Sequence, residues 1–284
     1  MTATLAMTLS LDAVGKRTAP RRFSYGWRDC VLYALGVGAT QDDLRYVSEL
    51  EGPKVLPTFA VVPAFEPMVE ALGTIGGNVA MLVHGAQTVE LDGPLPPEGT
   101  IETTAVVEGI YDKEKGALAV IDTQSRAPGG QPIARTSWHL YFRGMGGFGG
   151  PRGPEPPANL PPEGAAPDRR VTSATSPTQA ILYRLSGDVN PIHVSPEIAA
   201  LVGFERPILH GLCVYGFAAR AAIDWYCEGR PERFRSFHAR FAKVTYPGDD
   251  LRIEAWRDGP DALVRVTVPA RDAPVLTHGR MQVR

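Results

Sequence analysis

The most informative stretch of the sequence reads Ile-Leu-Tyr-Arg-Leu-Ser-Gly-Asp-Val-Asn-Pro-Ile-His, from Ile181 to His193. Its first part predicts a helix near residues 178–185. Pro191 disfavours a helical Asn190, so the chain should leave that helix in a tight turn. Such a turn can bring Asp188 and His193 to one side, where they share one water as acid and base. The alternative is that Asp188 and Asn190 only bond their own backbone as turn-forming residues, with His193 on the surface.

The same stretch indicates a duplication. Residues 181–185 repeat the pattern of residues 31–35 at an offset of 150. A second block repeats at the same offset: Leu91, Pro97 and Ile101 correspond to Phe241, Pro247 and Leu251. Two separate blocks that share one offset indicate duplicated halves. At this offset Asp188 falls opposite Gly38, and His210-Gly211 falls opposite Ala60-Val61. We therefore expect catalysis in the C-terminal half.

A second segment, Pro207-Ile-Leu-His-Gly211, precedes a helix. From Gly211 onward the apolar residues have helical spacing with few polar residues between them, which is typical of a helix buried nearly all round. His210 and Gly211 lie at its start, where free N–H groups and the positive end of the helix dipole hold an anionic oxygen. A glycine chosen for chain geometry alone is the competing explanation. Beside an Asp/His pair we favour an oxyanion-type site.

These segments resemble the MaoC-like, R-specific enoyl-CoA hydratases (the hydratase 2 family), which include the hydratase domain of peroxisomal multifunctional enzymes. The resemblance rests on Ser-Gly-Asp-Val-Asn-Pro-Ile-His at 186–193 and Arg-Pro-Ile-Leu-His-Gly-Leu-Cys at 206–213. Further matches follow in order along nearly the whole chain, at residues 31–38, 55–59, 83–85, 95–97, 146–150 and 241–248. The fold that it implies is α+β, a tandem or double hotdog, in which each half is a long central helix wrapped by an antiparallel sheet.

The resemblance also implies the site residues. The catalytic positions are Asp188, His193, Asn190 and Gly211, and the positions that contact the coenzyme A thioester are His84, Gly85, Lys113 and Phe241. Judged from the residues alone, Lys113 is a hairpin lysine within residues 112–116, Phe241 can be plain core packing, and His210 can be a structural histidine that orients the turn.

The implied reaction is syn addition of water to trans-2-enoyl-CoA, which yields (3R)-3-hydroxyacyl-CoA. Asp188 and His193 would hold the water, Gly211 N–H would stabilise the thioester oxygen, and Asn190 would orient the water or the acyl group. Which of the two side chains transfers each proton stays open. No metal or redox cofactor is expected, because the thioester already makes C3 electrophilic and coenzyme A is part of the substrate.

Two alternatives remain. One is a non-catalytic acyl-thioester-binding subunit, which the presence of both Asp188 and His193 disfavours. The other is a related hydro-lyase acting on a branched, dicarboxylic or steroid-side-chain acyl-CoA. The small residues Gly73, Gly76, Gly77 and Ala80 lead us to expect an interrupted central helix in the first half, with room for a medium or long acyl tail.

The composition is that of a globular protein with ample core, with 44% hydrophobic and 21% charged residues among 284. The net charge of -2 disfavours a nucleic-acid partner. Three cysteines do not suggest a disulfide framework, and the His and Cys residues lack the spacing of a zinc site. We identify no signal peptide, no apolar run long enough to span a membrane and no C-terminal SKL, and therefore expect a cytoplasmic enzyme without a membrane partner. The resemblance further implies a homodimer, which would cover open sheet edges.

We expect two domains and a linker. Residues 1–143 would be the non-catalytic half that binds the acyl tail, after a loosely ordered lead-in to about residue 22; residues 171–284 would be the catalytic half. Residues 144–170, rich in Gly and Pro, would be the linker. It contains a formal G-x-G-x-x-G at Gly144, Gly146 and Gly149, but Pro151 and Pro154 prevent a helix after it, so we reject a dinucleotide site. The expected strands are 100–111, 117–124, 135–142, 238–246, 250–256, 262–268 and 275–283, with a short helix at 196–202.

Overall fold

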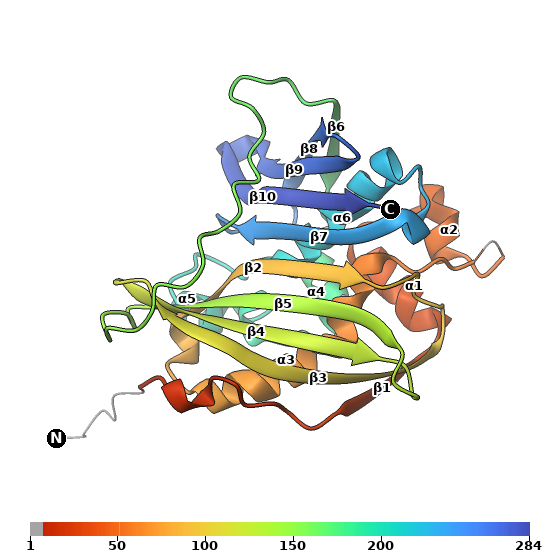
Figure 1. Cartoon of the computed structure of the whole chain (residues 1–284). Coiled ribbons are helices and arrows are strands. Elements are labelled where there is room, and N and C mark those ends of the chain that lie inside the picture. Colours follow the sequence, from red (N-terminus) through yellow and green to blue (C-terminus); the bar gives the residue numbers. More distant parts are fainter. Residues whose placement is uncertain (1–7, 51) are drawn as a thin grey trace.

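The computed structural model describes residues 8–50 and 52–284 and shows two halves built on one plan (Figure 1). The first half contains β1 (Arg21–Tyr25), α1 (Trp27–Gly36), α2 (Leu44–Val47), α3 (Val61–Ile75), β2 (Leu82–Leu91), β3 (Gly99–Asp112), β4 (Gly116–Arg126) and β5 (Pro132–Arg143). The second contains β6 (Arg169–Ala174), α4 (Gln179–Tyr183), α5 (Pro196–Leu201), α6 (Gly211–Tyr226), β7 (Phe234–Phe241), β8 (Asp250–Asp258), β9 (Asp261–Val268) and β10 (Ala273–Val283).

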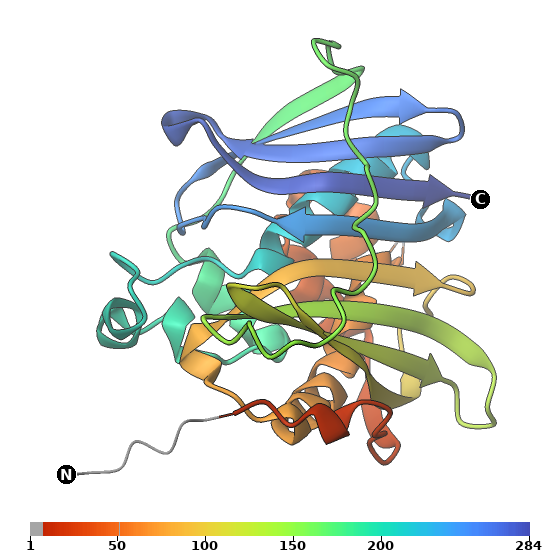
Figure 2. The same cartoon turned by 60° about the vertical axis from the view of Figure 1, so that its left-hand side comes forward.

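The strands form one antiparallel sheet in the order β1-β3-β4-β5-β2-β7-β10-β9-β8-β6. Its two halves meet where β2 pairs with β7, and at the middle of that pairing Thr88 lies opposite His238. The hydroxyl of Thr88 is 2.8 Å from Nδ1 of His238. The sheet wraps α3 in the first half and α6 in the second, and the linker runs along the outside of the sheet from β5 to β6 (Figure 2). The predicted double hotdog is confirmed.

The two central helices begin at equivalent positions. α6 starts at Gly211, as predicted, and α3 starts at Val61, which is the position 150 residues earlier. α6 is buried on nearly all sides, because most of its residues between Leu212 and Ile223 are apolar and face either the sheet or the first half.

The predicted interruption of the first central helix is wrong. α3 runs unbroken from Val61 to Ile75 with Pro67 inside it, and the small residues lie in its last turn and beyond it. Gly76, with a φ of 71°, ends the helix. Together with the preceding 3₁₀ turn, residues 57–75 are long and apolar enough to cross a membrane, contrary to our expectation that no segment is. This segment is 56% buried, however, and α3 packs on β3 and β4, so its hydropathy reflects a place in the core.

Other boundaries also differ from the predictions. β1, β2 and β6 were not predicted, and β7 ends at Phe241 rather than 246 because the chain leaves the regular strand there to form a cavity wall. Within the lead-in, residues 1–7 lie outside the described residues. Residues 9–22 are packed rather than loose: Leu9 bridges to Gly76, Ala13 is fully buried, and residues from Arg21 belong to β1.

The glycine-rich start of the linker binds a carboxylate of the same chain. Asp112 accepts hydrogen bonds from the amides of Gly147 at 2.9 Å and Gly149 at 2.8 Å. Within the described residues no helix follows this loop before β6, as the prolines predicted. The motif therefore anchors the linker to the end of β3.

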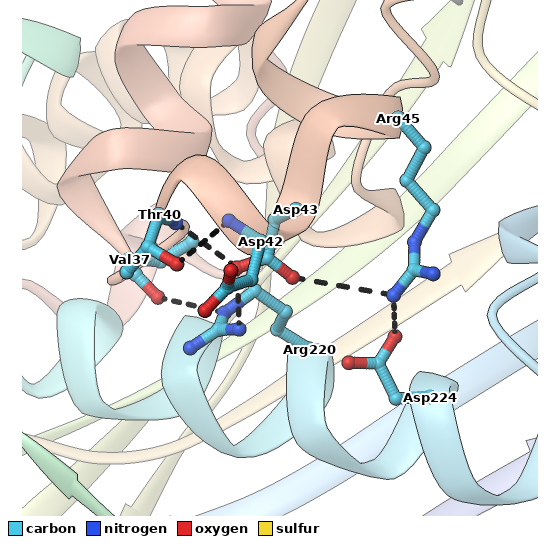
Figure 3. Close-up of polar contacts among 7 residues, drawn as sticks. All are labelled: Val37, Thr40, Asp42, Asp43, Arg45, Arg220 and Asp224. Atoms are coloured by element: carbon cyan, nitrogen blue, oxygen red, sulfur yellow. Dashed lines mark hydrogen bonds and ion pairs between the residues drawn. The ribbon is translucent and has the colours of Figure 1, made fainter.

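Ion pairs connect α6 to the first half (Figure 3). Arg220 donates to Asp43 at 3.1 Å and to the carbonyl oxygen of Val37 at 3.4 Å. Arg45 binds Asp224 and lies 4.0 Å from Asp43. The side chains of Arg220 and Asp43 are only 13% and 10% exposed, so this pair is largely shielded from solvent. The helix that begins at the candidate site is thus fixed to α2 and the loop before it.

Candidate active site

A cavity of about 690 Å³ is lined by both halves and contains the predicted turn. The second half contributes Asp188, Asn190 and His193 and the first residues of α6. The first half contributes an apolar wall, formed by Phe65, Met68, Val69 and Leu72 of α3 together with Leu82, Val83, Trp138 and Leu140. The cavity therefore has a polar, reactive side and a long apolar side.

The turn is held by its own side chains. Gly187 has a φ of 122°, which turns the chain away from the short helices before it. The carboxylate of Asp188 accepts from the amide of Asn190 at 3.2 Å, and the side-chain oxygen of Asn190 accepts from the amide of Ile192 at 3.2 Å. The Asn190 bond caps a 3₁₀ turn over Pro191–His193. Asp188 and Asn190 are therefore turn-forming residues and also line the cavity, so both readings of the sequence describe part of the structure.

His193 has a defined hydrogen-bonding state. Its Nδ1 lies 2.8 Å from the carbonyl oxygen of Ile208, so Nδ1 carries a proton and donates it. Nε2 is then the free nitrogen of the neutral ring, and it lies 3.9 Å from Oδ2 of Asp188. That separation is too long for a direct hydrogen bond, but a water about 2.8 Å from each atom can bridge it.

Burial acts on the two groups in opposite directions. It raises the pKa of the Asp188 carboxyl, an effect that the neighbouring His193 partly offsets. It lowers the pKa of His193, an effect that Asp188 partly offsets. The two pKa values are thereby drawn toward each other, which suits a pair that exchanges protons through one water.

His210 packs against His193 and contacts the backbone of Asp188. It is 1% exposed, its ring stacks on that of His193 with centroids 3.5 Å apart, and its Nε2 lies 3.0 Å from the carbonyl oxygen of Asp188. Burial lowers the pKa of His210 to about 3, so the ring is neutral at physiological pH. His210 thus joins the turn to the start of α6.

Gly211 combines an available amide with a close contact. It is the first residue of α6, so its N–H precedes the first intrahelical hydrogen bond and points beyond the helix end. A Cβ at this position would lie 3.1 Å from Cδ1 of Phe241. Glycine therefore allows the Phe241 ring to pack against the helix start, where both residues line the cavity.

His84, Gly85 and Phe241 form the adjoining wall. The register of β2 against β5 shifts between His84 and Ala86, which places Gly85 in a bulge. The His84 ring stacks on Trp138 at 5.4 Å and tilts against Phe241 at 4.7 Å. Burial lowers the pKa of His84 to about 3, and its Nε2 has no hydrogen-bond partner within the described chain. This neutral imidazole is available to hydrogen-bond a ligand.

The structure does not bring Lys113 to the cavity. Lys113 lies in the turn between β3 and β4, where its amide donates to the carbonyl oxygen of Gly116 at 2.9 Å. The cationic residues that line the cavity are Arg143, at the end of β5, and Lys243, just after β7. Sequence reasoning missed both, although Lys243 lies inside the segment matched at 241–248. With these two cations and Asp188 as the one acidic residue of the lining, the cavity suits an anionic ligand.

Asp188, His193 and His210 form the one group of possible metal ligands in the described part of the chain, with ligand atoms within 4.8 Å of one another. Their geometry does not suit an ion. The imidazole lone pairs lie in the ring planes, and the two rings are stacked with an interplanar angle of 24°, so the lone pairs do not converge on one point. One nitrogen of each ring is also engaged by a carbonyl oxygen.

A double hotdog with an Asp/His turn beside the start of its second central helix defines a class of acyl-thioester proteins, and the chain belongs to the MaoC-like, hydratase 2 family. Residues 23–144 match the MFE-2 hydratase 2 N-terminal domain, and residues 159–274 match the MaoC like domain.

Relatives match this protein over nearly its whole length. The enoyl-CoA hydratase ChsH3 of Mycobacterium tuberculosis is 39% identical, over 96% of this chain and 98% of its own length. The 3-hydroxyacyl-thioester dehydratase Y of the same organism is 40% identical over 94% of each chain. The crystal structure of a MaoC-like dehydratase from Phytophthora capsici superimposes with a TM-score of 0.87 at 32% identity, covering 97% of this chain and 98% of that one.

Proposed function

We propose that this protein catalyses the reversible syn hydration of trans-2-enoyl-CoA to (3R)-3-hydroxyacyl-CoA in fatty-acid metabolism. The observation that carries the proposal is the separation of 3.9 Å between Asp188 Oδ2 and His193 Nε2, inside a cavity with an apolar wall. The names of the two M. tuberculosis relatives, a hydratase and a dehydratase, describe the two directions of one reaction.

In this mechanism one water lies between Asp188 and His193. The pair carries one proton at the start. The member without it removes a proton from the water as the water oxygen bonds to C3, and the member with it delivers that proton to C2. Both groups act from the same side of the double bond, so the addition is syn. A proton transfer between the two side chains then restores the starting state.

Backbone and amide groups stabilise the charge that develops. The Gly211 N–H, at the positive end of α6, would donate to the thioester oxygen as an enolate forms. The side-chain oxygen of Asn190 is engaged by the amide of Ile192, which leaves its NH₂ group to orient the water or the acyl group. His84, Gly85 and Phe241 would contact the thioester arm, with Arg143 and Lys243 placed for the anionic part of coenzyme A.

The proposed reaction uses no metal or redox cofactor. The thioester supplies the electrophilic C3, and the stacked imidazoles of His193 and His210 are poorly arranged for coordination. Hydration that is unaffected by a chelator supports this part, and activity restored only by an added metal ion contradicts it.

The direct test is turnover of a trans-2-enoyl-CoA series with chiral analysis of the product. We expect the R alcohol from purified protein without nucleotide. An S product would contradict the assigned geometry. Binding without turnover would support a non-catalytic acyl-thioester-binding subunit instead.

We further propose a homodimer that acts in the cytoplasm without a membrane or nucleic-acid partner. The outer strands β1 and β6 leave sheet edges that a second chain can protect. A monomeric mass by light scattering at working concentration would contradict the dimer.

A further inference from the structure

A second cavity, of about 200 Å³, lies behind the catalytic turn. Its floor is apolar and is formed by Phe23 of β1, Leu32 of α1, and Phe59, Val62 and Pro63 around the start of α3. Its other lining residues include two cations, Arg21 and Arg22, and two acids, Asp29 and Glu66. Arg21 and Glu66 pair at 2.5 Å, and Arg22 pairs with Glu102 at 3.3 Å.

Phe65 separates this cavity from the candidate active site. It is the one residue that lines both cavities in the described chain. Its ring lies edge-on to Trp138, 6.1 Å between centroids, and is only partly buried. Truncation of this side chain would therefore remove atoms that bound both cavities.

The catalytic turn also lies between the two cavities. Gly187 lines the second cavity, and the next residue, Asp188, lines the first.

We propose that the second cavity takes the distal end of a long, straight acyl chain, and that Phe65 determines whether the chain enters. The inference rests on the proposed function and extends it to chain-length selection. The apolar floor fits a methyl-ended chain. The two arginines of the lining are each paired with a glutamate, which disfavours a terminal carboxylate there.

The test compares kcat/KM for straight trans-2-enoyl-CoA substrates of four to sixteen carbons. Val62→Phe fills the second cavity without touching the first, and Phe65→Ala removes the partition. Burial of one methylene is worth about 0.8 kcal/mol, or about fourfold. Filling room for two or three methylenes should therefore lower the long-to-short ratio of kcat/KM by about 15- to 60-fold. Phe65→Ala should raise that ratio, and the double variant should lose the gain.

The controls are Val47→Phe and Phe148→Ala, which make the same changes at partly buried positions outside both cavities. Both should keep the wild-type ratio. An unchanged ratio in Val62→Phe, or a gain from Phe65→Ala that survives in the double variant, would overturn the assignment of the second cavity. Absence of hydration with every substrate, the four-carbon one included, in folded wild-type protein would instead refute the proposed function.

Discussion

Replacing Asp188 by asparagine separates the chemistry of the site from its shape. Asparagine has the same size, and its side-chain oxygen can still accept the hydrogen bond that the Asn190 amide gives to Asp188 at 3.2 Å. The turn, its link to His210 and the cavity wall should therefore persist. The amide cannot take or give the proton that the bridging water requires.

The expected loss follows from that single function. General acid–base catalysis contributes roughly 10²- to 10⁴-fold, so kcat should fall by about that factor, which is about 3–5 kcal/mol in the barrier. KM should change by less than about threefold, because the groups placed for coenzyme A lie on β2, β5 and after β7. Steady-state hydration of a four-carbon and a ten-carbon enoyl-CoA measures both constants.

Two further variants make the result decisive. Asp122→Asn alters a carboxylate on β4 outside the cavity and should leave kcat unchanged. Asp188→Asn combined with His193→Gln should be little worse than the poorer single variant, because the two groups act on one water. Turnover near the wild-type rate in folded Asp188→Asn would refute the shared-water mechanism.

Three other outcomes follow from the structure. Burial raises the pKa of Asp188, so its carboxyl contributes stability below the unfolded pKa of about 3.9, and this contribution is lost as pH rises through the folded pKa. The melting temperature of Asp188→Asn should therefore exceed that of the wild type at pH 8, and the difference should vanish below pH 4. A difference that does not depend on pH would contradict this. His84→Ala should raise KM about tenfold or more with kcat within about threefold, and a loss confined to kcat would instead place His84 in the chemistry. Arg220→Met should lower the free energy of unfolding in urea by about 3 kcal/mol, because Asp43 loses its shielded partner. Arg152→Met removes an exposed pair and should lower that free energy far less, and equal losses in the two variants would contradict the role of the network.

Local chemistry was enough to predict the turn and the start of α6. Pro191 disfavours a helical Asn190, and the apolar pattern after Gly211 indicates a buried helix; both effects act within a few residues. The offset of the duplication also holds in the structure, because α3 starts at Val61, 150 residues before Gly211, without any helix-start motif there. These are the elements that position Asp188 and His193.

Features decided by distant contacts could not be predicted. Arg143 and Lys243 line the cavity only because the ends of β5 and β7 are brought to its side by sheet pairing. Trp138 stacks on His84 because β5 lies next to β2, which no local pattern reveals. Lys113 matched a family position by order along the chain, but the hairpin places it elsewhere.

The contact between Thr88 and His238 has a consequence for how the protein associates. The two residues are 150 positions apart, which is the offset of the duplication, so each is the counterpart of the other and they pair directly. A residue that faces its own counterpart lies on a local two-fold axis, which is the geometry of an isologous dimer. Fusion of two copies into one chain makes that dimer intramolecular. The two equivalent positions then no longer have to hold the same residue, so a threonine and a histidine form a hydrogen bond there. The edges of β2 and β7 pair with each other within a single molecule, so any association between two chains must use another surface.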